Sequence, residues 1–249
     1  MVHPGNFWSK IRQRYISYQI KRYLLTRKLY HYAPYPLDIY EQCLKSLKSL
    51  QHQQLIRFLN GEGINRKGDI IFVRHDIDTQ ECIRNLPETL EIDQRLRVEA
   101  GIYLRFDNEE YMAGDHREML LKYKDHGFEI GLHSLCYTKE NYLQEFQRET
   151  ERFKSIMGFQ PRSFSVHGLG SFRLEIRMKF LHEITHCFHE FGYETGDIPP
   201  LRAYEHVIHD SHLDNENRRF LYDDFLYFPR FSSRRRRYLV LTHPCYWKV

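Results

Sequence analysis

The stretch DIIFVRHDID, residues 69–78, joins an apolar run rich in β-branched side chains to two carboxylates that follow it at once. The run from Asp69 to His75 predicts a buried strand of a parallel sheet. Asp76 and Asp78 lie on the turn that leaves this strand, and their like charges are hard to hold so close without a cation. One carboxylate can ligate a metal while the other acts as a base. An Asx turn with a helix cap accounts for a single carboxylate, and less well for the pair.

Strands and helices alternate along the chain after this stretch. Clear strands are predicted at 101–106, 128–133, 162–167 and 238–243, and weaker ones near Tyr193, at 204–209 and at 225–228. Helices are predicted at 37–59, 81–99, 115–127, 138–158 and 174–191. Such alternation is typical of a mostly parallel α/β sheet or barrel. In these folds the chemistry collects at the C-terminal ends of the strands.

Three histidines end three of the clear strands. His133 ends the strand 128–133, His167 ends 162–167, and His243 ends 238–243. A lone histidine is more often a hydrogen-bonded core residue than a ligand, but three at equivalent strand ends, beside an aspartate pair, indicate a shared site. Imidazole and carboxylate ligands with one open position are typical of a hydrolytic zinc or similar centre.

Three segments of the sequence resemble motifs of the polysaccharide deacetylase superfamily (NodB homology, similar to carbohydrate esterase family 4), in its branch with R-H-D-x-D as first motif. They are Arg74–Asp78, the EIGLHS segment Glu129–Ser134, and the LTHP segment Leu241–Pro244. The resemblance covers about residues 37–170 and 238–247, whereas residues 171–237 match poorly. It implies a distorted (β/α) barrel of about seven strands over residues 37–249, preceded by N-terminal helices in residues 1–36.

The resemblance also implies roles for individual residues. Asp76 would be the general base, His243 the general acid, and Asp78 and His133 metal ligands. The cofactor would be a divalent metal, zinc in the first place, with cobalt, manganese or nickel as alternatives. The substrate would be an N-acylated amino sugar, such as a polysaccharide precursor.

The chain departs from the family pattern at two places. The family has a second histidine four residues after the first, where this sequence has Tyr137, and we predict that His167 supplies the missing imidazole. The family's arginine motif is not visible around Ser163–Gly168. The candidates for substrate binding are Arg74, Tyr137 and Trp247, and Trp247 could instead anchor the C-terminal residues. A different amide or ester substrate, or an inactive barrel that binds carbohydrate or membrane, remains an alternative.

A competing motif lies on the predicted helix 174–191. The segment His182–His186 reads HEITH and matches the HExxH pattern of zinc peptidases, with Glu183 as base. A third ligand could be His189 or Glu205. We favour a solvated helix face on the outside of the sheet. Asp223 and Asp224 could orient a catalytic histidine or contact a sugar, although a loop acid pair is the simpler interpretation.

The N-terminal segment 1–36 has a different composition from the rest. It contains seven Lys and Arg residues and no Asp or Glu, and residues 9–32 have the spacing of an amphipathic helix. Such a helix can lie on an anionic membrane surface or pack on the domain. The sequence has no bilayer-spanning apolar run and no signal peptide, and its five scattered cysteines predict free thiols in a reducing compartment. We therefore expect a cytoplasmic protein that can lie peripherally at the inner membrane face. The basic run Arg234–Arg237 predicts a solvated loop, and no nucleic-acid partner is expected.

Overall fold

The computed structural model describes residues 35–50, 56–57, 71–106, 113–135, 140–167, 183, 206–210 and 238–248. Several expectations lie outside these residues: the basic helix 9–32, Tyr137, His182, His186, His189, Glu205, Asp223, Asp224 and the run Arg234–Arg237. The predicted strands near Tyr193 and at 225–228, and the helix 174–191 apart from Glu183, also lie outside them. None of the helices in the described ranges is both long and apolar enough to span a membrane.

The main sheet of the described chain has six strands, all parallel, in the order β7-β6-β5-β3-β9-β8. Their bounds are β3 Ile71–Ile77, β5 Gly101–Leu104, β6 Glu129–Ser134, β7 Phe164–Val166, β8 His206–His209 and β9 Tyr238–Thr242. On one side of β3 lie β5, β6 and β7, in the order in which they occur in the chain. On its other side β3 pairs with β9, the last strand of this sheet in the sequence. A (β/α) barrel has this order, because its last strand closes against its first. The expected parallel α/β barrel architecture is confirmed, and six of its strands lie in the described ranges.

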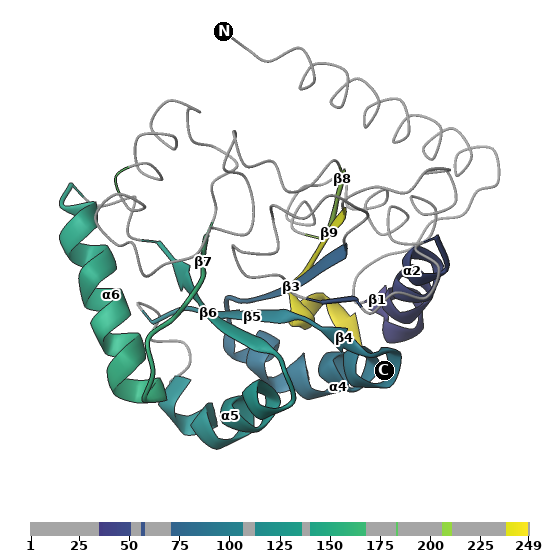
Figure 1. Ribbon diagram of the computed structural model, residues 1–249, viewed down its shortest axis with the longest axis horizontal. Helices are drawn as coiled ribbons and strands as arrows, with labels where there is room; N and C mark the ends of the chain where they lie inside the picture. The colour runs from purple at the N-terminus through teal and green to yellow at the C-terminus, as the bar shows by residue number, and fades with distance from the viewer. Residues whose placement is uncertain are drawn as a thin grey trace, which may run out of the picture.

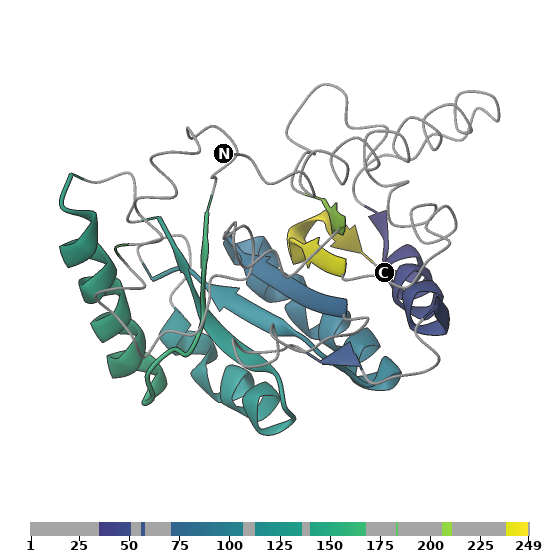
Figure 2. The same ribbon diagram turned by 45° about the horizontal axis from the view of Figure 1, so that its top comes forward.

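Helices follow the strands and cover one side of the sheet. They are α2 Leu37–Leu50, α4 Gln80–Leu96, α5 Arg117–Asp125 and α6 Tyr142–Met157, with the short 3-10 turns η1 Ala113–His116 and η5 Pro244–Tyr246. Figures 1 and 2 show α4, α5 and α6 along the same side of the strands. Helix α4 begins where the Thr79 side chain accepts the N–H of Cys82, and it ends at Arg97 in the left-handed conformation. These helices carry the chain back so that successive strands run in the same direction.

The core lies between the sheet and these helices. It is built from fully buried aliphatic and aromatic side chains, among them Leu44 of α2, Leu86 and Leu90 of α4, Ile102 of β5 and Phe153 of α6. Each such side chain contributes about 1.5–3 kcal/mol of burial free energy. The same strands bury polar residues toward their C-terminal ends, including Arg74, Asp76 and His133. Buried polar groups need hydrogen-bond partners, so these residues must form polar contacts with one another or with their neighbours at that end of the sheet.

The C-terminal residues are tied to the start of the domain. Strand β10 (Trp247–Lys248) pairs in parallel with β1 (Tyr35–Pro36), the last two residues of the segment 1–36. A second short pair joins β2 (Ile56–Arg57) to β4 (Val98–Glu99). The ring of Trp247 is 1% exposed and lies against the rings of Tyr35 and Tyr40. This corrects the expected sugar-stacking role of Trp247, because a buried ring presents no face to a sugar.

Candidate metal centre

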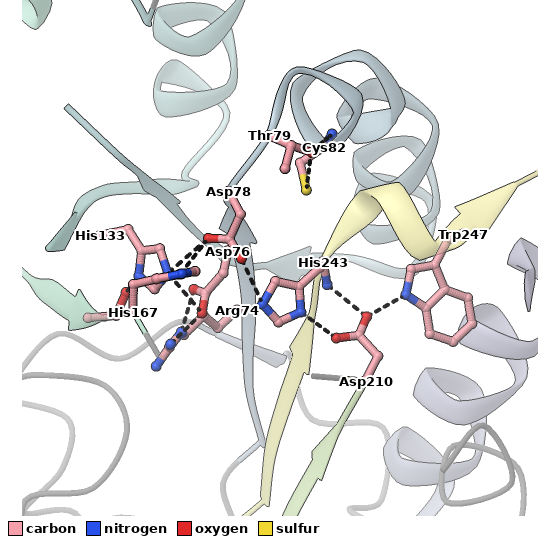
Figure 3. A network of polar contacts seen from close by, with 11 residues as sticks. Arg74, Asp76, Asp78, Thr79, Cys82, His133, His167, Asp210, His243 and Trp247 are labelled. Carbon is pink, nitrogen blue, oxygen red and sulfur yellow. Dashed lines mark hydrogen bonds and ion pairs between the residues drawn. The ribbon is translucent and has the colours of Figure 1, made fainter. Parts of the chain in front are cut away.

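Polar side chains from four strands converge at the C-terminal edge of the sheet (Figure 3). Asp76 lies at the end of β3 and Asp78 just after it, His133 lies near the end of β6, and His167 and His243 directly follow β7 and β9. Parallel strands end at one edge, so residues far apart in the sequence meet there. The structure thus brings together all five residues that the strand-end argument selected.

Three of these side chains place their donor atoms around one point. Asp78 Oδ1 lies 3.1 Å from His133 Nε2 and 3.0 Å from His167 Nδ1, and the two nitrogens are 3.2 Å apart. Donors bound to a tetrahedral zinc at about 2.0–2.1 Å lie about 3.3 Å from one another. The arrangement therefore fits a divalent cation with little movement. His167, chosen for its position at a strand end, is the third member of this cluster, and its replacement of the family's second histidine stays a prediction.

The charge on Asp78 is stabilised by the two histidines. Burial by itself would raise the pKa of this carboxyl, but the hydrogen bonds from His133 and His167 outweigh it and hold the pKa well below its usual range. An ionised carboxylate is the form that ligates a metal. Asp78 is therefore charged at neutral pH and ready to act as a ligand.

The orientation of the His133 ring is fixed by Ser165, which contacts the ring nitrogen that faces away from Asp78. His133 Nδ1 lies 2.6 Å from Ser165 Oγ on β7, and this contact holds the ring with Nε2 toward Asp78. His133 is 1% exposed, whereas the His167 side chain is 31% exposed. The candidate centre is thus closed on the side of His133 and more accessible on the side of His167.

Asp76 is held by an arginine of its own strand. Arg74 donates from Nε to Asp76 Oδ1 at 2.6 Å and from Nη2 to Oδ2 at 2.5 Å, and both side chains are buried. Burial alone would raise the pKa of Asp76, but the Arg74 guanidinium and the nearby His133 keep it below its usual value. Arg74 was expected to bind substrate. In the structure its fork holds the buried carboxylate of Asp76, and a contact with substrate stays a prediction.

Gly131, the glycine of the EIGLHS segment, leaves room for the Tyr103 ring that packs against Arg74. The ring of Tyr103 on β5 lies beneath the Arg74 guanidinium, 5.5 Å from its centroid. A Cβ on Gly131 would lie 2.5 Å from a ring carbon of Tyr103. A larger residue at position 131 would therefore displace the ring on which Arg74 rests.

His243 is held by an aspartate from a neighbouring strand. His243 Nδ1 lies 2.5 Å from Asp210 Oδ1, and its backbone N–H donates to Oδ2 at 2.7 Å. Trp247 Nε1 also donates to Oδ2, at 2.8 Å. The other ring nitrogen, Nε2, lies 3.4 Å from Asp78 Oδ2 and so faces the metal ligands. Burial would lower the pKa of His243, but Asp210 first, and then Asp78 and Asp76, raise it to about 10. A cation among the ligands would lower it again, because its charge opposes protonation.

Asp210 is the site residue that the sequence argument did not select. It directly follows β8, which is a short strand with histidines at both ends and therefore gave only a weak apolar signal. The acidic pair Asp223–Asp224 was considered as the partner of a catalytic histidine instead. The weaker strand predicted at 204–209 ends directly before Asp210, so the strand-end criterion that selected His167 would have selected Asp210 as well, had it been applied to the weaker strands.

The competing HExxH motif is described only at Glu183. This side chain accepts a hydrogen bond from the hydroxyl of Tyr142, the first residue of α6. His182 and His186 lie outside the described residues. The peptidase alternative therefore stays a prediction.

The fold and the site together define a parallel α/β barrel protein with a candidate Asp-His-His metal centre at its strand ends. No protein-family model matches the chain, and no curated protein matches it. Among solved structures, the chain is similar to a mutant of BA3943 with restored enzymatic activity (TM-score 0.47, 17% identity, covering 72% of this chain and 57% of that one). It is also similar to wild-type BA3943, a CE4 family pseudoenzyme from Bacillus anthracis (TM-score 0.45, 17% identity, covering 72% and 56%).

Both of these structures are of a protein assigned to the CE4 family, the carbohydrate esterase family that the three sequence motifs resemble. The chain spans little more than half of their length.

Proposed function

We propose that the protein is a metal-dependent hydrolase that removes an N-acyl group, such as acetyl, from an amino sugar. The observation that carries the proposal is the cluster of Asp78, His133 and His167, whose donor atoms lie 3.0–3.2 Å apart. A carboxylate, Asp76, and an imidazole, His243, border this cluster. A metal ligand set with a separate base and acid beside it is what amide hydrolysis requires.

The three ligands suit a divalent cation that keeps an open coordination position. One carboxylate and two imidazoles are a donor set for zinc, and cobalt, manganese or nickel accept the same ligands. When bound, such a cation would polarise the acyl carbonyl and lower the pKa of the attacking water. The more exposed side of the cluster, at His167, leaves room for substrate to approach.

Asp76 is the proposed general base. Its Oδ2 lies 3.7 Å from His133 Nε2, so it borders the ligand set directly. The two hydrogen bonds from Arg74 keep the carboxylate ionised and fix its orientation. An ionised, immobile carboxylate at this position can accept a proton from water without first having to reorganise.

His243 is the proposed general acid. Asp210 accepts the proton on Nδ1, and this leaves Nε2 to face the site. The charge of Asp210 raises the pKa of the ring and so favours the protonated state that a proton donor needs. His243 would deliver this proton to the amine as the C–N bond breaks.

The amino-sugar substrate is proposed from the family resemblance of the three motifs. If residues 9–32 lie on anionic lipid, the substrate would be a polysaccharide precursor at the cytoplasmic face of a membrane. Sedimentation of the protein with anionic but not with neutral vesicles tests this location. Loss of this sedimentation when Lys10, Arg12 and Arg14 are replaced by Gln would support it, and unchanged sedimentation would contradict it.

The test of the activity is acetate release from oligomers of N-acetylglucosamine. Protein freed of metal with a chelator is assayed alone and after addition of zinc, cobalt, manganese or nickel. We expect release only with added metal, and we expect Asp76→Asn to abolish it while the bound metal stays. Metal binding without hydrolysis of any acylated sugar would favour the inactive, carbohydrate-binding barrel. Cleavage of a peptide substrate that survives in Asp78→Ala and is lost in Glu183→Gln would favour the peptidase.

A further inference from the structure

Two cysteines that are distant in the sequence meet beside the candidate centre. Cys82 lies in the first turn of α4 and Cys245 lies in η5. Both are free thiols, and their side chains are neighbours where η5 packs against the first turns of α4. Cys82 is fully buried, whereas Cys245 is partly exposed. The pair is therefore in contact and within reach of a small solute on one side.

The two turns that carry these cysteines are fastened to each other. Thr79 Oγ1 accepts the Cys82 N–H at 3.3 Å and contacts Cys82 Sγ at 3.5 Å, and this fixes the first turn of α4 (Figure 3). One turn later, Asn85 Nδ2 donates to the carbonyl oxygens of Pro244 at 3.3 Å and Trp247 at 3.4 Å, on either side of Cys245. Because Asn85 fastens the two backbones to each other, the thiols are held as neighbours.

We propose that Cys82 and Cys245 are a modification site at which a reversible disulfide joins α4 to η5. The oxidant is a low-molecular-weight disulfide such as oxidised glutathione. The two cysteines lose two electrons and two protons and form one S–S bond, and the glutathione disulfide is reduced to two thiols. The exchange passes through a mixed disulfide with one of the two cysteines, which the other cysteine then resolves.

The position of the bond gives it a structural consequence. Asp78 precedes Cys82 by four residues, and His243 precedes Cys245 by two. The disulfide would therefore cross-link the turn that carries a metal ligand to the turn that carries the proposed acid. It closes a long loop of the chain, which restricts the unfolded state and stabilises the folded one.

The experiment exposes the full-length protein to oxidised glutathione, blocks the remaining thiols, and maps the disulfides by mass spectrometry without reduction. We expect one linked pair of peptides that contain Cys82 and Cys245, the loss of two thiols per chain, and full reversal by dithiothreitol. Cys43→Ser serves as the matched control, since Cys43 is buried in α2, and should keep the link. Cys245→Ser should abolish it. Glutathione adducts on folded wild-type protein, with no bond between Cys82 and Cys245, would overturn the proposal.

Thermal unfolding gives a second readout that does not depend on enzymatic activity. The oxidised wild type and the oxidised Cys43→Ser variant should melt several degrees higher than their reduced forms. Cys245→Ser should show no such difference. An equal shift in Cys245→Ser would assign the stabilisation to another cysteine. Where a serine variant fails to fold, peptide mapping of the wild type still decides the question, and neither readout requires the proposed hydrolysis.

Discussion

The two sides of the candidate centre are held in different ways. On one side, Asp76 is held by Arg74, a residue two positions away on the same strand. On the other, His243 is held by Asp210, which comes from a neighbouring strand and is 33 residues away. The first pairing is local and is visible in the R-H-D-x-D motif. The second depends on the order of β8 and β9 in the sheet, and this order is known only from the fold.

The ligand set stands between these two sides, and its removal should have the largest effect. Asp78→Ala removes the carboxylate that both histidines contact. We expect the variant to bind no stoichiometric zinc and to release no acetate. Metal analysis of dialysed protein measures the first and the acetate assay the second. A variant that keeps one zinc per chain would place the metal elsewhere.

The His243 side should respond next. Asp210→Asn keeps the shape of the side chain but removes the charge that orients His243 and raises its pKa. We expect kcat to fall by about 10²–10⁴-fold, which is the usual contribution of a general acid. Zinc content should stay at the wild-type level, because Asp210 is not a ligand. Steady-state kinetics together with metal analysis distinguish loss of the general acid from loss of the bound zinc. An unchanged kcat would show that Asp210 does not assist the reaction.

The substitution Arg74→Gln should disrupt the pairing that holds Asp76 and lower the stability of the fold. The substitution leaves a buried carboxylate without its charged partner, and this costs about 3–5 kcal/mol of folding free energy. Urea unfolding measures the loss. The double variant Arg74→Gln/Asp76→Asn is the matched control: it should recover much of the stability and still lack activity. If the single variant is as stable as the wild type, the pairing of Arg74 with Asp76 contributes nothing to folding.

The smallest effect is expected at the support of His133. Ser165→Ala removes the hydroxyl that lies 2.6 Å from His133 Nδ1. Loss of such a partner behind a metal ligand weakens metal binding by about 10–100-fold. Titration of chelator-treated protein with zinc should show this, and Ser134→Ala, on the neighbouring strand β6, offers a comparison at a hydroxyl that bonds to Glu149 instead. Equal affinity in wild type and Ser165→Ala would contradict the proposed support.

The sequence predicted the parts of this site that depend on local patterns. Strand-end position and the family motifs identified Asp76, Asp78, His133 and His243, and position alone identified His167. Asp210 was missed because β8 is short and polar at both ends. Trp247 could not be assigned between stacking and anchoring, since its burial depends on β1 and α2, which come from the other end of the domain. Such contacts are fixed by tertiary packing, which no local pattern records.

The contact between Cys82 and Cys245 was hidden for the same reason. Scattered, unpaired cysteines in a sequence predict free thiols, and the structure has both in that state. Their proximity arises only because η5 packs against the first turns of α4. As with Asp210 and His243, the chemistry open to a side chain depends here on a residue distant in the sequence. The residues next to it in the sequence do not reveal this contact.

A crystal structure of the protein soaked with zinc, with anomalous data recorded at the zinc edge, tests the central claim most directly. The account predicts one strong peak bonded to Asp78 Oδ1, His133 Nε2 and His167 Nδ1, at about 2.0–2.2 Å from each atom. A peak bonded instead to His182 and His186, with none among these three residues, would contradict it.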